Sequence, residues 1–87
     1  MRYVCPVCGY DQLEEPPANF TICDSCGTEF GYHDATFTHA ALRERWIAEG
    51  AKWHSSVFAP PPGWNPVQQL LRAGFAYRPT APEVNRK

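Results

Sequence analysis

Four cysteines occur as two pairs of identical spacing in the first third of this 87-residue chain. Cys5 and Cys8 form one Cys-x-x-Cys-Gly motif, Cys23 and Cys26 form another, and 14 residues separate Cys8 from Cys23. Two intervening residues allow a tight turn to aim both sulfurs of a pair at one point about 2.3 Å away, and the following glycine permits a positive φ. Each motif, called a knuckle below, therefore supplies half of a tetrahedral ligand set.

Four cysteines can also form disulfide bonds or a redox-active dithiol. Disulfide scaffolds carry about 8–10% cysteine, more than this chain has, and Cys5 falls where a secretory leader would still be running. We therefore expect no leader and a reducing, cytoplasmic location. A thioredoxin-like dithiol opens a helix within a βαβ pattern, whereas a glycine follows each pair here. Metal binding is the favoured interpretation.

The paired knuckles resemble a zinc ribbon, and the single knuckle resembles that of rubredoxins. The resemblance implies a tetrahedral metal site bound by Cys5, Cys8, Cys23 and Cys26, with Zn²⁺ as the expected ion in a closed, structural site. A rubredoxin-like iron electron carrier is the alternative. The spacer between the knuckles is shorter than in rubredoxins, however, and Asp24 stands where their second knuckle has proline.

Short apolar segments around the knuckles predict the β part of a small α+β fold. Strands are expected at residues 3–4, 20–22 and 29–32, paired as short antiparallel hairpins, with residues 14–19 as a polar hairpin tip. Aromatic side chains on these strands are expected to shield the metal site from water, namely Tyr10, Phe20, Phe30 and Tyr32.

Two helices complete the predicted fold. The first is expected from about residue 38 to 50, with Thr38 as N-cap and a possible extension to His54, and its charged residues, Arg43 among them, are expected on the solvated side. A stiff proline-rich connector follows at residues 59–64. The second helix is expected after Asn65, with Pro66 at its first position, Gly74 as its stop and a buried face made of Val67, Leu70 and Leu71.

The net charge of −1 hides two halves of opposite sign. Residues 1–34 contain one basic and six acidic residues, a net charge of −5, whereas residues 35–87 contain seven basic and three acidic residues, a net charge of +4. We expect residues 1–34 to form the ribbon, residues 35–79 to dock on it as part of one domain through this complementarity, and residues 80–87 to form a disordered tail.

No catalytic arrangement can be recognised in the sequence, so we predict no catalytic residues and no enzyme activity. The three histidines lack the short spacing of a metal motif, and no apolar run of about 18 residues could span a membrane.

Three tryptophans in so small a domain suggest a surface that binds another protein, because tryptophan is enriched at binding hot spots. The candidate surface residues are Trp46, Trp53 and Trp64.

A nucleic-acid-binding zinc ribbon is a further alternative, and nucleic acid is not the favoured partner. Four thiolates on one Zn²⁺ add two negative charges to an acidic ribbon, which should repel phosphate. Only basic residues of the second half could bind it, namely Arg72, Arg78, Arg86 and Lys87.

Residues 3–71 as a whole resemble a group of small bacterial proteins with paired cysteine knuckles. The likeness rests on the two knuckles, on a tryptophan-containing helical segment at residues 42–53 and on the Pro-Pro-Gly-Trp turn at residues 61–64. Related families place two adjacent cysteines where this chain has Asp24 and Ser25, a departure that keeps the ligand count at four. The resemblance implies a cytosolic metal-binding protein and no reaction, which leaves an interaction or regulatory module as the expected function.

Overall fold

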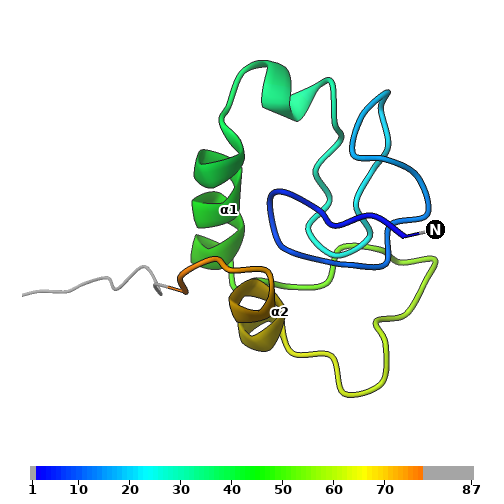
Figure 1. Cartoon of the computed structure of the whole chain (residues 1–87), viewed down its shortest axis with the longest axis vertical. Helices are drawn as coiled ribbons and strands as arrows, with labels where there is room; N and C mark the ends of the chain where they lie inside the picture. The colour runs from blue at the N-terminus through cyan, green and yellow to red at the C-terminus, as the bar shows by residue number, and fades with distance from the viewer. Residues whose placement is uncertain (1, 78–87) are drawn as a thin grey trace, which may run out of the picture.

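The computed structural model describes residues 2–77. Helical elements in this range are a short 3₁₀ turn, η1 (His33–Ala35), and two α-helices, α1 (His39–Ala48) and α2 (Pro66–Arg72). In Figure 1, α1 lies to the left of the knuckle loops and α2 lies below them. The whole segment between the two helices, residues 49–65, is called the connector from here on and runs along the lower edge of the molecule. The tail predicted at residues 80–87 lies outside the described residues. None of the helices in residues 2–77 has the length and apolar character needed to cross a membrane.

The predicted zinc ribbon with antiparallel β-hairpins is wrong. Residues 2–77 contain no β-strand, and their antiparallel pairing is limited to isolated bridges, Tyr3 with Leu13 and Ile22 with Glu29. Pairing beyond the first bridge stops because the knuckle closes on itself, with the Cys5 N–H donating to the Tyr10 carbonyl at 2.7 Å. Two residues of extended backbone are too few to propagate a ladder, so the small α+β class is replaced by two helices packed on irregular loops.

The other two predicted strands are interrupted by left-handed backbone conformations. Phe20 has a φ of 64° at the start of the segment predicted at 20–22, and Gly31 has a φ of 95° in the middle of the segment predicted at 29–32. A strand needs extended dihedral angles at consecutive residues, so each segment contributes one bridge residue only, Ile22 in the first and Glu29 in the second. The apolar composition of these segments predicts strands but does not reveal the left-handed residues.

Both helix N-termini are confirmed. The Thr38 side chain accepts a hydrogen bond from the Ala41 N–H, and Asn65 accepts one from the Gln68 N–H, each at 3.0 Å. Pro66 follows Asn65 at the first helical position, as predicted. α1 ends at Ala48 and does not extend toward His54, because the backbone is left-handed at Gly50 and Ala51, directly after the C-cap residue Glu49.

The core lies between the helices and the knuckles. It combines three of the cysteines, Phe30 and Val7 with the buried faces of the helices, which are Leu42, Trp46 and Ile47 in α1 and Gln69 and Leu70 in α2. The prediction for α2 is only partly right, since Leu71 is exposed and a glutamine takes the second buried position. The predicted aromatic shield is also incomplete, because Phe20 and Tyr32 are exposed while Phe30 is buried.

Candidate metal centre

The four cysteine sulfurs converge on one point between the knuckles. The Sγ atoms of Cys5 and Cys26 are 3.8 Å apart, those of Cys8 and Cys23 are 3.7 Å apart, and all four lie within 4.8 Å of one another. Four sulfurs placed about 2.3 Å from a central ion in a regular tetrahedron would be about 3.8 Å apart. None of the four forms a disulfide bond. Their arrangement therefore fits a tetrahedral metal ion.

Each knuckle is a tight turn that points its sulfurs inward. The Gly9 N–H donates to the Cys5 carbonyl at 2.9 Å, and the Gly27 N–H donates to the Cys23 carbonyl at 2.8 Å. Both glycines have the positive φ that the sequence predicted, 86° and 81°. A residue with a β-carbon would be strained at either position. The two knuckles thus have the same local geometry although they lie in different parts of the chain.

Hydrogen-bond donors lie close to two of the four sulfurs, those of Cys5 and Cys26. The N–H groups of Val7 and Cys8 point at Cys5 Sγ at 3.4 and 3.5 Å, and the Thr28 hydroxyl lies 3.3 Å from Cys26 Sγ, where it can donate once that sulfur is deprotonated. Such contacts stabilise a thiolate over a thiol. This surrounding suits sulfurs that carry negative charge.

The sulfurs cannot all be ionised without a cation. Burial raises the pKa of the Cys8 thiol, and the neighbouring sulfurs, Cys26 first, raise the pKa of Cys23. Hydrogen bonds from the other three cysteines, Cys23 first, lower the pKa of Cys26. Four thiolates this close together repel one another, whereas a bound divalent cation neutralises charge on all four. The donor set is therefore one that a thiophilic cation completes.

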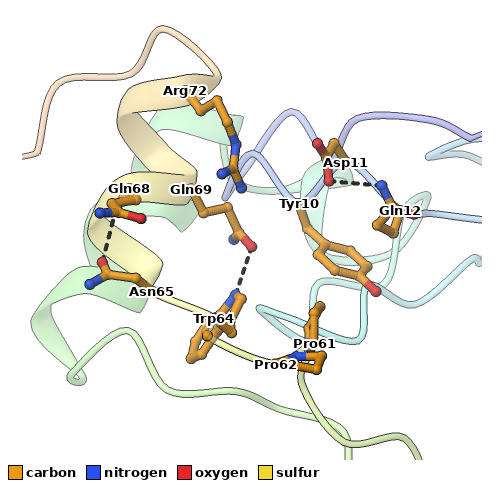
Figure 2. Close-up of a pocket in the computed structure, with 11 residues that line it drawn as sticks. Tyr10, Asp11, Gln12, Pro61, Pro62, Trp64, Asn65, Gln68, Gln69 and Arg72 are labelled. Carbon is orange, nitrogen blue, oxygen red and sulfur yellow. Dashed lines mark hydrogen bonds between the residues drawn. The ribbon is translucent and has the colours of Figure 1, made fainter.

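Gln69 of α2 joins the two knuckles. Its side-chain NH₂ donates to the Cys8 carbonyl at 3.2 Å and to the Ser25 hydroxyl at 3.0 Å, and its Oε1 accepts from the Trp64 indole N–H at 2.8 Å. The side chain is almost fully buried, and Figure 2 shows it between α2 and Trp64. Gln69 therefore fixes α2 to one residue of each knuckle.

Arg43 of α1 holds the first knuckle from the other side. Its guanidinium donates to the carbonyls of Val7 at 2.7 Å and Pro6 at 2.8 Å, and it stacks 3.6 Å above the ring centre of Phe75. Burial lowers the pKa of Arg43, and the nearby Cys5 and Cys8 act in the opposite direction. A positive charge thus lies next to the sulfurs, where the sequence had predicted a solvated side chain.

The chain after α1 packs on the second knuckle. The N–H groups of His54 and Ser55 donate to the Asp24 carbonyl at 3.1 and 2.9 Å. A β-carbon added to Gly27 would lie 2.6 Å from Nδ1 of the His54 ring, so the ring approaches the knuckle closely. Both knuckles are therefore held by segments from the second half of the chain.

The structure places the three predicted surface tryptophans at different depths. Trp46 is buried in the core and its indole N–H donates to the Lys52 carbonyl at 2.9 Å. Trp53 and Trp64 are half-buried and pack edge to face on each other, with ring centres 5.3 Å apart, and Trp53 packs in the same way on Tyr10. All three indole rings therefore contribute to packing within the chain.

Sequence reasoning missed the two side chains that tie the helices to the knuckles, Gln69 and Arg43. Gln69 lies 61 residues from its partner Cys8, and Arg43 lies 36 residues from Val7. Contacts between residues so far apart in the sequence leave no recognisable motif. The one available signal was the position of Gln69 beside Leu70, on the buried side of a short helix.

No family model, curated protein sequence or solved structure matches this chain. The site is therefore interpreted from its own geometry.

Proposed function

We propose that the protein is a zinc-stabilised module that binds another protein, in which Cys5, Cys8, Cys23 and Cys26 hold one structural Zn²⁺. The observation that carries the proposal is the convergence of four sulfurs at tetrahedral spacing, with no fifth His, Cys, Asp or Glu in the group of candidate ligands among residues 2–77. Four protein ligands leave no open position for substrate, which is typical of structural zinc sites. In this role the metal site stabilises the fold and catalyses no reaction.

Metal analysis of the purified chain tests the metal centre. We expect one zinc per chain by elemental analysis and native mass spectrometry, and a colourless protein. A coloured protein with one iron and a reversible one-electron couple would instead support the iron alternative, since the same sulfurs can bind iron.

Cys23→Ser provides the matched variant, because it removes one sulfur from the set and leaves Cys5, Cys8 and Cys26 in place. We expect loss of the bound zinc and of cooperative unfolding, since folding of small metal domains is coupled to metal binding. Ser56→Ala, at an exposed position outside the knuckles, is the control and should keep both. A Cys23→Ser chain with unchanged metal content and melting temperature would refute the site.

A further inference from the structure

A groove of about 510 Å³ lies beside the connector. One wall comes from the first knuckle and the segment after it, with Leu13 and Tyr10; another comes from residues 21–24; and the third comes from the connector, with Phe58 and Pro61. Much of its lining is apolar, and its volume falls in the range of about 300–1,000 Å³ that is usual for ligand pockets. We call it the acidic groove, for the charges described below.

The connector exposes two adjacent apolar side chains, of which Phe58 lines this groove and Val57 precedes it in the sequence. Val57 is 79% exposed and Phe58 is 63% exposed. Large apolar side chains exposed together often mark a binding site.

This part of the connector is held in one conformation. The Ser55 hydroxyl accepts hydrogen bonds from the N–H groups of Val57 and Phe58 at 3.1 and 3.0 Å, and the Trp53 indole donates to the Phe58 carbonyl at 2.7 Å. Three prolines at residues 60–62 then restrict the backbone. A backbone segment that is already ordered loses little conformational entropy when a partner binds it. Half-buried Trp53 thus positions the backbone of Phe58.

The charges around the acidic groove are mostly negative. Its charged lining residues are Glu14, Glu15, Asp24 and Arg2, a net charge of −2, and Arg2 forms an ion pair with Glu14 at 3.0 Å. The four-thiolate centre behind Asp24 adds negative charge when it holds Zn²⁺. Clefts lined by one sign of charge attract ligands of the opposite sign.

A second groove, of about 280 Å³, lies on the other side of Tyr10 and Pro61, and its lining residues are drawn in Figure 2. It is less suited to a charged partner, because Asp11 and Arg72 carry opposite charges. The indole N–H of Trp64, another lining residue, already donates a hydrogen bond to Gln69.

We propose that the acidic groove binds a basic segment of another protein, with one apolar side chain packed beside Phe58 and Lys or Arg side chains facing Glu15 and Asp24. The inference rests on the proposed interaction function and names the partner's chemistry. The metal centre fixes one wall, because Asp24 directly follows the ligand Cys23.

Binding of synthetic peptides to the metal-loaded full-length chain tests the inference. The probe is a fluorescein-labelled ten-residue peptide of lysines around a central Leu-Phe pair, followed by fluorescence anisotropy. Two reference peptides replace either the Leu-Phe pair by Ser-Ser or every lysine by glutamate. We expect micromolar affinity for the probe and at least tenfold weaker affinity for both references. Equal binding of the Ser-Ser peptide, or no binding of the probe, would overturn the inference.

Matched variants locate the binding surface. Phe58→Ala and Glu15→Lys should each weaken probe binding at least fivefold, whereas Phe37→Ala and Glu49→Lys should leave the affinity within twofold. Phe37 and Glu49 are exposed and do not line the acidic groove. Equal losses in all four variants would overturn the inference.

Two measurements on the same samples separate the remaining outcomes. Sedimentation velocity detects self-association, and a dimer that Phe58→Ala dissociates would overturn the inference by making a second copy the occupant. Zinc content separates the inference from the proposed metal centre. A chain with one zinc that does not bind the probe refutes the groove alone, whereas a zinc-free chain that binds it refutes the metal centre alone.

Discussion

At the scale of single residues, Gln69 connects the two knuckles although it is not one of the candidate ligands. Its amide forms hydrogen bonds with a buried carbonyl of one knuckle, a buried hydroxyl of the other and the indole N–H of half-buried Trp64. Leaving buried polar groups without partners costs about 1–3 kcal/mol for each group. A glutamine can serve all three because its amide both donates and accepts.

Gln69→Ala is therefore expected to lower the free energy of unfolding by about 3 kcal/mol, since two buried partners and one half-buried partner lose their hydrogen bonds at once. Urea unfolding of the zinc-loaded chain, followed by tryptophan fluorescence, measures the change. Gln68→Ala removes the neighbouring exposed glutamine side chain and should change stability by less than about 0.5 kcal/mol. Similar losses in both variants would show that Gln69 does not join the knuckles.

Arg43 depends on the shape of its guanidinium as well as on its charge. Two N–H groups reach adjacent carbonyls while the plane stacks on Phe75, a geometry that an ammonium group cannot reproduce.

We expect Arg43→Ala to destabilise the chain by about 2 kcal/mol and Arg43→Lys by more than half of that amount. Thermal unfolding followed by circular dichroism gives the comparison. Arg45→Ala is the control, because its ion pair with Glu49 is exposed and 3.4 Å long, and such pairs contribute about 0.3–0.5 kcal/mol. Full retention of stability by Arg43→Lys would mean that charge alone matters.

At the scale of elements, α1 and α2 are too short to be stable alone. They have ten and seven residues, and isolated helices shorter than about 12–15 residues are marginal in water. Their stability comes from packing on the knuckles. A substitution at the end of either helix should therefore also destabilise the knuckles.

Asn65→Ala is expected to lower the free energy of unfolding by about 1 kcal/mol, because the N-cap side chain no longer accepts from the Gln68 N–H. Asn65→Ser keeps a capping oxygen and should recover most of the loss. Chemical denaturation of the three chains at fixed zinc concentration checks the order. If serine and alanine gave equal losses, the cap would not be what starts α2.

The difference between helices and strands shows which features the sequence could predict. Thr38, Asn65, Pro66 and the two knuckle glycines act on their immediate neighbours, so their types and spacing were sufficient. The predicted strands failed because pairing depends on consecutive extended residues, and Phe20 adopts a left-handed conformation that its apolar character does not indicate. The pairing of cysteines within each knuckle followed from local spacing, and the joint site of both knuckles followed from the resemblance to zinc ribbons. The contacts that hold the knuckles together are long-range and were not predicted.

At the scale of the whole molecule, the opposite charges of the two halves contribute little direct pairing. Among residues 2–77, ion pairs lie within a half, as in Arg2 with Glu14 and Arg45 with Glu49, except for His39 with Asp34 across the boundary. Packing and hydrogen bonds from Gln69, Arg43 and the backbone of His54 join the halves instead. The acidic character of the first half thus remains available at the surface, around the acidic groove.

Because the knuckles, both helices and the connector share one core around the sulfurs, removal of the metal should unfold residues 2–77 as a unit. We expect a chelator to abolish the helical circular dichroism signal and the tryptophan emission shift together, in one transition. Added zinc should then raise the melting temperature with concentration, each tenfold increase above the dissociation constant adding about 1.4 kcal/mol of stability. Calcium serves as the control ion, since it prefers oxygen ligands and should have no such effect. Retention of the helical signal in the chelated chain would show that Arg43, Gln69 and the apolar core suffice without the ion.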